Sequence, residues 1–192
     1  MGIELDAESV RFTLQIENRS PYKIGEVFSP ILGGVTGLGD ASRDLRATRL
    51  VRPAATGIAS SDIFFTFANF SDLGDQGAEQ FYLYPKDWTE PWMELHSPKH
   101  RRSLYLGAHD PADRAKVLHL ELQPGHAQTA RWDGNWPRPE ELGGLPAGVL
   151  ISVVDFANYP AGKTYEAAPV ILQAHDGDGQ EGQRIYRKWK NR

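Results

Sequence analysis

Residues 10–17, VRFTLQIE, carry the pattern that decides the fold. Apolar residues occupy every second position from Val10 to Ile16, and polar residues fill the positions between them. Successive side chains of a β-strand point to opposite faces, so this period of two predicts an antiparallel strand with one face toward the core and one toward water. Residues 116–123, KVLHLELQ, repeat the pattern with their leucines on one face and His119 on the other.

Further short runs of β-branched and aromatic residues are spread along the chain. The nineteen glycines and thirteen prolines fall mostly between these runs, where such residues favour turns. No interior stretch of ten or more residues sustains a helical period. The sequence therefore predicts an all-β fold, an antiparallel β-sandwich. The further expected strands are residues 24–28, 63–67, 80–83, 92–96, 103–108, 128–132, 149–156 and 169–174.

Composition excludes several classes of function. The 192 residues are 40% apolar and 24% charged, as in a globular domain with a substantial core. A net charge of −4 gives no footprint for nucleic acid, and the nearest approach to a basic cluster, KHRR at residues 99–102, is expected in a solvated hairpin loop. No apolar run approaches the roughly 18 residues of a membrane span. We expect neither nucleic acid nor membrane as a partner.

The C-terminal end predicts one helix. After the loop at residues 176–179, DGDG, Ile185, Tyr186 and Trp189 recur at offsets of one, three and four and form one apolar stripe. We expect a β-sandwich domain at residues 1–182 and, at residues 183–192, the start of a linker helix toward an absent downstream domain. If nothing covers the stripe, this end should self-associate or fray. In the alternative interpretation the helix folds back on its own sheet.

The sequence nominates no catalytic residue, no metal ligand and no cofactor. The absence of cysteine excludes thiolate chemistry. His96 and His100 cannot share a helix face because Pro98 lies between them, and no HExxH spacing exists. The DGDG loop lacks the downstream Glu of a calcium loop and is expected to be a plain turn. No nucleophile elbow, phosphate loop or dinucleotide fingerprint is present.

Aromatic residues are the candidates for ligand contact, because sugar rings stack their C–H faces on flat aromatic rings. Trp88 lies between Pro85 and Pro91, which predicts an exposed loop. Trp92 lies in an expected strand and is expected to be half-buried. Core packing is the competing interpretation for both residues and is the stronger one for Trp92. Two further candidates lie in the long loop at residues 132–146, namely Trp132 and Trp136.

Several segments, read in order, resemble a known family. They are the strand and turn ending in Phe-x-Pro-x-Leu within residues 10–34, then WMEL at 92–95, SLYLGAHD at 103–110 and IYRKW at 185–189. This order resembles the galactose-mutarotase-like β-supersandwich domain that precedes a (β/α)8 barrel in bacterial glycoside-hydrolase-like proteins. These proteins are relatives of α-galactosidases and endo-α-N-acetylgalactosaminidases. SLYLGAHD is the most specific of the motifs.

The resemblance implies a function. In these families the catalytic carboxylates lie in the barrel, so this chain would be a non-catalytic domain that supports the barrel and shapes one wall of its carbohydrate cleft. Its partners would be the downstream barrel and carbohydrate. Domains of this kind exceed 192 residues, which implies a truncated sandwich. The residues expected to face the cleft or the domain interface are Trp88, Tyr105, His109, Asp110, Tyr186 and Trp189.

Two other functions remain open from the sequence. A stand-alone carbohydrate-binding module would use Trp88, Trp92, Trp132 or Trp136 as its stacking platform and would bind a glycan in isolation. A mutarotase-like sugar isomerase would use His109 and Asp110 as acid and base and would interconvert anomers measurably.

Overall fold

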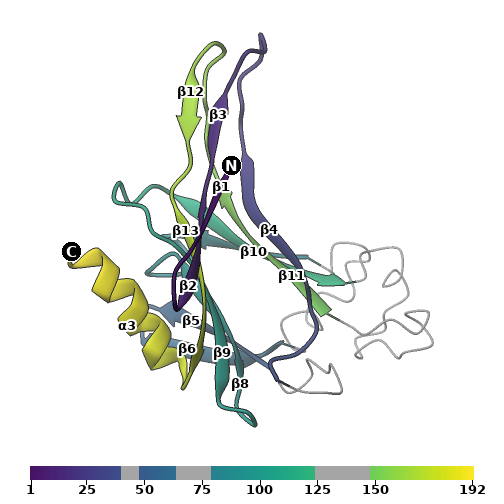
Figure 1. Ribbon diagram of the computed structural model, residues 1–192, viewed down its shortest axis with the longest axis vertical. Coiled ribbons are helices and arrows are strands. Elements are labelled where there is room, and N and C mark those ends of the chain that lie inside the picture. Colours follow the sequence, from purple (N-terminus) through teal and green to yellow (C-terminus); the bar gives the residue numbers. More distant parts are fainter. Residues whose placement is uncertain (40–47, 64–78, 124–147) are drawn as a thin grey trace.

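The protein is an antiparallel β-sandwich, as the sequence predicts (Figure 1). The structure, a computed structural model, describes residues 1–39, 48–63, 79–123 and 148–192. A seven-stranded sheet packs against a four-stranded sheet, and a two-stranded arm extends from the sandwich. In spatial order the large sheet contains β1 (Gly2–Leu5), β2 (Ser9–Thr13), β13 (Val170–Asp176), β9 (Arg102–Ala108), β8 (Trp92–Ser97), β5 (Arg49–Ala54) and β6 (Gly57–Asp62). The small sheet contains β4 (Val27–Val35), β11 (Gly148–Asp155), β10 (Lys116–Gln123) and β7 (Glu79–Tyr84), and the arm pairs β12 (Thr164–Glu166) with β3 (Gln15–Glu17).

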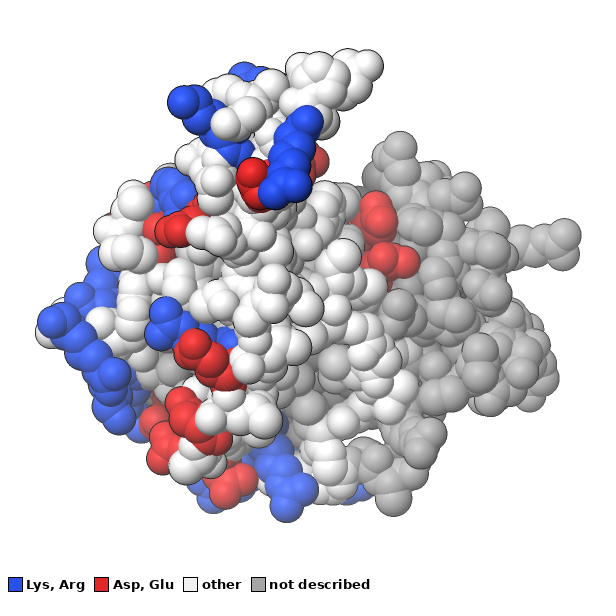
Figure 2. Space-filling model, turned by 45° about the horizontal axis from the view of Figure 1, so that its top comes forward, with Lys and Arg blue, Asp and Glu red and all other residues white. Residues whose placement is uncertain are grey.

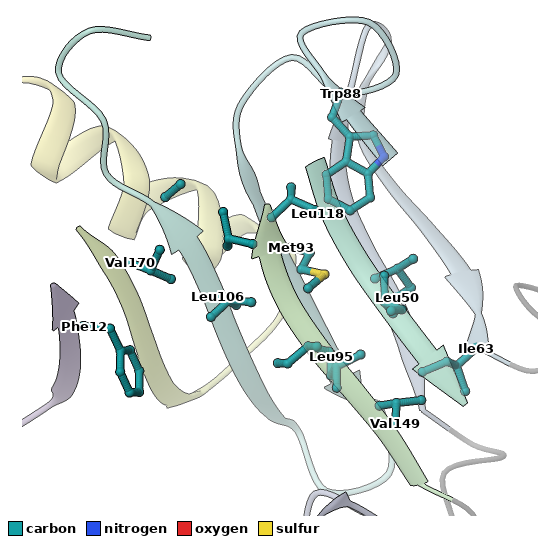
Figure 3. Packing of buried hydrophobic residues seen from close by; sticks show 14 residues of the cluster. Phe12, Leu50, Ile63, Trp88, Met93, Leu95, Leu106, Leu118, Val149 and Val170 are labelled. Atoms are coloured by element: carbon teal, nitrogen blue, oxygen red, sulfur yellow. The ribbon is translucent and has the colours of Figure 1, made fainter. Parts of the chain in front are cut away.

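The main core lies between the two sheets (Figure 3). The alternation in β10 works as predicted, because Leu118 and Leu120 are fully buried and face the large sheet. Met93 of β8 and Leu106 of β9 meet them from the other side. The side chain of Leu122 lies outside the described part of the chain.

Residues 10–17 do not form one strand, which corrects the sequence prediction. They divide between β2 and β3, which belong to different sheets, and Leu14 lies between them with its carbonyl accepting from the backbone of Ala167. Phe12 therefore reaches the core, whereas Leu14 and Ile16 are only partly buried. The expected strand at residues 128–132 and, apart from Ile63, the one at residues 63–67 lie outside the described residues. The strands that the sequence missed are β1, β5, β6 and β12.

The single helix of the described residues, α3 (Gly179–Lys190), begins earlier than predicted. Asp178 caps it, because its carboxylate accepts from the backbone N–H of Gln180 at 3.1 Å. Glu181 in the first turn and the basic residues of the last turn suit the helix dipole. The DGDG segment is thus the turn and cap that start the helix. Neither the length nor the hydropathy of α3 meets the needs of a membrane span.

Helix α3 packs on the outer face of the large sheet, against β8, β5 and β9 (Figure 1). Tyr186 is fully buried in a second cluster with Trp92 and Tyr105, while Ile185 and Trp189 are partly buried beside it. One face of α3 therefore packs on the protein's own sheet, as the alternative interpretation of the sequence predicted. The downstream domain and the self-association of this end stay predictions.

Two glycines let the helix approach the sheet closely. A Cβ at Gly182 would collide with Glu94 and crowd the ring of Trp92, and a Cβ at Gly179 would collide with Val51. Both positions are buried, so no side chain fits between helix and sheet there. The contact therefore depends on the absence of a side chain at these two positions.

We expect Gly182→Ala to destabilise the protein by about 1–3 kcal/mol, because it overpacks this contact. The direction of the stability change is informative, since replacing glycine by alanine at an open helix position would stabilise the protein by up to about 1 kcal/mol. Urea unfolding followed by circular dichroism measures the change. Gln180→Ala, at an exposed position of the same helix, is the control. A Gly182→Ala variant as stable as the wild type would contradict the close contact.

Candidate functional site

The segment SLYLGAHD aligns Tyr105, Gly107 and His109 along the outer face of β9 and its end. Tyr105 and Gly107 share this face, and His109 follows the end of the strand. A Cβ at Gly107 would collide with the Tyr105 ring, so the glycine lets the phenol lie along the strand. The Tyr105 hydroxyl reaches His109 Nε2 at 3.0 Å and fixes the imidazole.

Two of the motifs that carry the family resemblance, SLYLGAHD and IYRKW, meet at His109. The His109 ring stacks on Trp189 of α3, with ring centroids 4.5 Å apart and an interplanar angle of 22°. Its edge contacts Tyr186 at 5.8 Å. Trp92 lies beneath, 5.8 Å from Tyr105. The structure thus brings together five of the residues that the sequence nominated, from two strands and the helix.

The aromatic cluster is neutral at physiological pH. Burial, with a smaller contribution from Arg11, lowers the pKa of His109 to about 4. Burial also raises the pKa of Tyr105 and of Tyr186, so both phenols stay protonated. His109 is therefore available here as an apolar stacking ring and a neutral hydrogen-bonding group.

A groove of about 480 Å³ lies between α3 and the part of the large sheet formed by β2 and β13. Its aromatic and apolar lining comes from His109, Pro169, Ile171, Ile185 and Trp189. Flat polar groups of Arg11 and Gln173 line it from the strands. Lys and Arg side chains gather at the left edge of Figure 2, the side on which α3 lies in Figure 1. The charged groups that α3 contributes to the groove are Glu181, Arg184, Lys188 and, just after it, Arg192.

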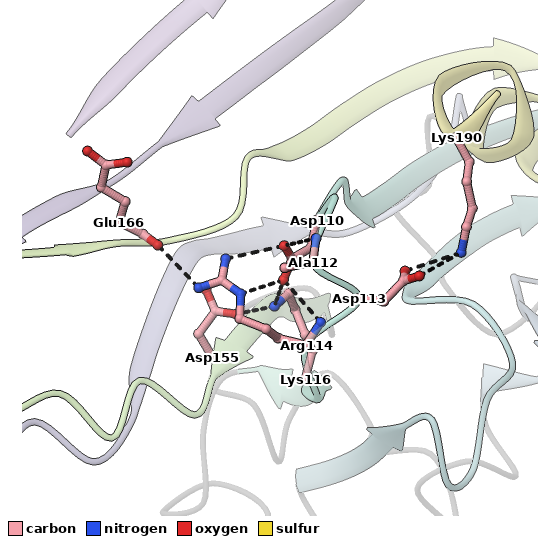
Figure 4. A network of polar contacts seen from close by, with 8 residues as sticks. All are labelled: Asp110, Ala112, Asp113, Arg114, Lys116, Asp155, Glu166 and Lys190. Carbon is pink, nitrogen blue, oxygen red and sulfur yellow. Dashed lines mark hydrogen bonds and ion pairs between the residues drawn. The ribbon is translucent and has the colours of Figure 1, made fainter. Parts of the chain in front are cut away.

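Asp110 does not line this groove but belongs to a network of ion pairs (Figure 4). Its carboxylate accepts from Lys116 Nζ at 2.7 Å and from Arg114 Nε at 2.8 Å. Lys116 is fully buried and also contacts Asp155 Oδ1 at 2.6 Å. Burial alone would raise the pKa of Asp110, but the hydrogen bonds from Arg114 and Lys116 hold it down to about 2. Asp110 is therefore a permanently ionised structural group.

His109 and Asp110 consequently do not act on one substrate as a pair. The histidine contacts the helix, whereas the aspartate pairs with Lys116 of the small sheet, which in turn contacts Asp155. The pairing of these two residues as acid and base, which the sequence left open, has no support in this geometry.

Trp88 and Trp92 do not offer a stacking surface, because both are buried. The exposed loop expected for Trp88 is therefore wrong, whereas the core packing favoured for Trp92 is confirmed. Trp88 is 1% exposed and stacks on Tyr82 in the main core, because its loop turns the ring inward (Figure 3). Trp92 is fully buried under α3, with its indole N–H donating to Glu90 at 2.8 Å. Trp132 and Trp136 lie outside the described residues.

Comparison with known proteins gives limited similarity. No protein-family model matches the sequence. No curated protein matches it either. Among solved structures, an α-galactosidase from Lactobacillus brevis is similar in fold with a TM-score of 0.47 and 7% sequence identity. The match covers 95% of this chain and 22% of that protein's chain, so this chain spans less than a quarter of its length.

We expect Lys116→Met to destabilise the protein by about 3–5 kcal/mol, because it leaves Asp110 and Asp155 buried without their shared cation. Lys190→Met is the matched control, since the Lys190–Asp113 pair is exposed and should contribute less than about 1 kcal/mol. Chemical denaturation at neutral pH compares the two variants. Equal losses would contradict the assigned role of the buried pair.

The low pKa of His109 predicts an acid-dependent loss of stability. In the unfolded chain His109 binds a proton near its ordinary pKa of about 6.5, whereas in the folded protein it does so near pH 4. Protonation therefore favours the unfolded state as the pH falls from 7 toward 4. Between pH 7 and pH 5 this contributes a loss on the order of 2 kcal/mol.

His109→Gln should remove this contribution, so the variant should lose correspondingly less stability than the wild type over that interval. Chemical denaturation of both proteins at pH 7 and pH 5 measures the loss of stability, and NMR titration of the His109 ring measures its pKa. A ring titration midpoint near the ordinary value, or an unchanged pH dependence in the variant, would contradict the buried neutral histidine.

Proposed function

We propose that this chain is a non-catalytic, carbohydrate-binding β-sandwich domain of a glycoside-hydrolase-like protein. The groove beside α3 is its sugar-contacting wall. In the whole protein this wall borders the cleft of a downstream catalytic barrel. The resemblance of the sequence motifs supports the assignment to this class of protein.

The observation that carries the proposal is the composition of the groove. Aromatic and apolar groups of His109, Ile185 and Trp189 lie beside the planar polar groups of Arg11 and Gln173. Sugars present apolar C–H faces and rings of hydroxyls, so a site for them needs an apolar surface bordered by donors and acceptors. A volume of about 480 Å³ suits a small oligosaccharide.

The location of the motifs supports the same conclusion. SLYLGAHD supplies Tyr105 and His109, and IYRKW supplies Tyr186 and Trp189, and these residues form one cluster. The motifs therefore converge on the groove. A non-catalytic role is favoured because the nominated base, His109, has its carboxylate neighbour committed to an ion network.

The stand-alone binding module is the second candidate, and one observation favours it. Both walls of the groove come from this chain, so sugar binding by the isolated domain needs no second domain. The two functions share one binding site and differ in whether a barrel stands beside it.

The test is sugar binding by the purified domain. A glycan array followed by calorimetric titration with raffinose and melibiose, as α-galactosides, should detect binding at millimolar affinity or better. Arg11→Ala and Gln173→Ala should each weaken it by about tenfold, the loss expected for one or two hydrogen bonds. Aryl-glycosides should not be hydrolysed.

Arg19→Ala is the control, because Arg19 is also cationic and exposed but lies beyond β3 on the arm. It should bind sugar as the wild type does. No binding to any array glycan at millimolar concentration, or equal effects of the three substitutions, would contradict the proposal.

A further inference from the structure

A second polar cluster lies on the outer face of the small sheet, away from the groove. In β10, Leu118 and Leu120 face the core, so His119 and Glu121 face outward. The antiparallel register places Glu121 directly opposite Glu79 of β7. Three ligand-capable side chains therefore share one face of two paired strands.

Their ligand atoms converge. One nitrogen of His119 and one carboxylate oxygen from each of Glu79 and Glu121 all lie within 4.8 Å of one another. His119 Nε2 is 4.0 Å from Glu79 Oε1. The separation is too long for a hydrogen bond but close to the spacing of ligands around a shared ion.

The imidazole of His119 is held in place from three sides. Its Nδ1 bonds to Ser152 Oγ of β11 at 3.0 Å. Phe81 stacks on the ring with centroids 4.5 Å apart, and Phe28 contacts it edge-on at 5.9 Å. The stack leaves His119 only 4% exposed. Such fixation of one ring nitrogen by a hydrogen bond is what orients the other nitrogen in metal-binding histidines.

The second nitrogen of His119 is the observation that points to a ligand. Nε2 is buried and has no hydrogen-bond partner among the described residues, although it is directed toward two carboxylates. Buried polar atoms are nearly always paired.

We propose that Glu79, His119 and Glu121 form a binding site for a divalent transition-metal ion, with zinc as the best match. One imidazole nitrogen and two carboxylate oxygens are a ligand set for zinc, whereas calcium and magnesium prefer oxygen alone. Tetrahedral zinc needs ligand atoms roughly 3.3 Å apart, which small rotations of the half-buried Glu79 and Glu121 side chains achieve. Three protein ligands leave the fourth position to water or another ligand.

The test measures metal binding directly. Tag-free protein is stripped with EDTA and titrated with zinc chloride by calorimetry, and cobalt chloride is followed by its visible absorption. We expect one site per chain, a rise in melting temperature with zinc, and an intense cobalt spectrum of a tetrahedral site. His119→Gln and Glu121→Gln should each weaken zinc binding by at least about tenfold and change the cobalt spectrum.

His96→Gln is the matched control. His96 also bonds through Nδ1 to a serine, Ser103, at 2.9 Å, but it does not belong to the cluster of metal-ligand atoms. It should leave zinc binding within about twofold. If His119→Gln fails to fold by circular dichroism, Glu121→Gln decides alone. Absence of zinc binding by the stripped protein, or a Glu121→Gln variant that binds like the wild type, overturns the proposal.

Discussion

The close approach of α3 to the large sheet is the constraint on which the site depends. Gly179 and Gly182 allow the helix to lie directly on β5 and β8. At that separation Tyr186 reaches Trp92 and Tyr105 and becomes fully buried. One turn later, Trp189 then lies on the His109 ring and the exposed side of α3 becomes a wall of the groove.

The end of β9 connects this cluster to the ion network between the sheets. His109 and Asp110 are neighbours in sequence, yet burial removes the charge of the first while Lys116 and Arg114 preserve the charge of the second. The backbone between them is thereby fixed from two sides, by the helix and by the small sheet. The three polar residues of LYLGAHD, which are Tyr105, His109 and Asp110, therefore each have a structural role.

The parts of the fold that sequence could predict are those with a clear period. The buried faces of β10 and α3 were predicted correctly from the leucines of β10 and the apolar stripe of α3. In each element one side is apolar and the other is polar. β6 could not be predicted because its sequence, GIASSD, consists mainly of small residues with no apolar alternation. It forms a strand because it pairs with β5. The break between β2 and β3 has no signal in the alternation, which continues across Leu14 although the chain changes sheets.

The candidate site was predictable in its residues but not in its geometry. The sequence nominated His109 and Trp189 without placing them together, since their contact spans eighty residues of the chain. The inward turn of Trp88 depends on the ring of Tyr82, and local composition does not reveal it. His119 and Glu121 do not match the helical spacings typical of metal ligands in sequence, because they share a face through the period of two of a strand.

The most direct test of the account is the NMR signal of each tryptophan indole N–H during titration with the glycan that binds most tightly. Trp189 lines the groove, whereas Trp88 and Trp92 are buried in the core and under the helix. We expect the Trp189 signal to move as the protein becomes saturated with the glycan and the Trp88 and Trp92 signals to stay fixed. A Trp189 signal that stays fixed at saturation would contradict the placement of the sugar beside α3.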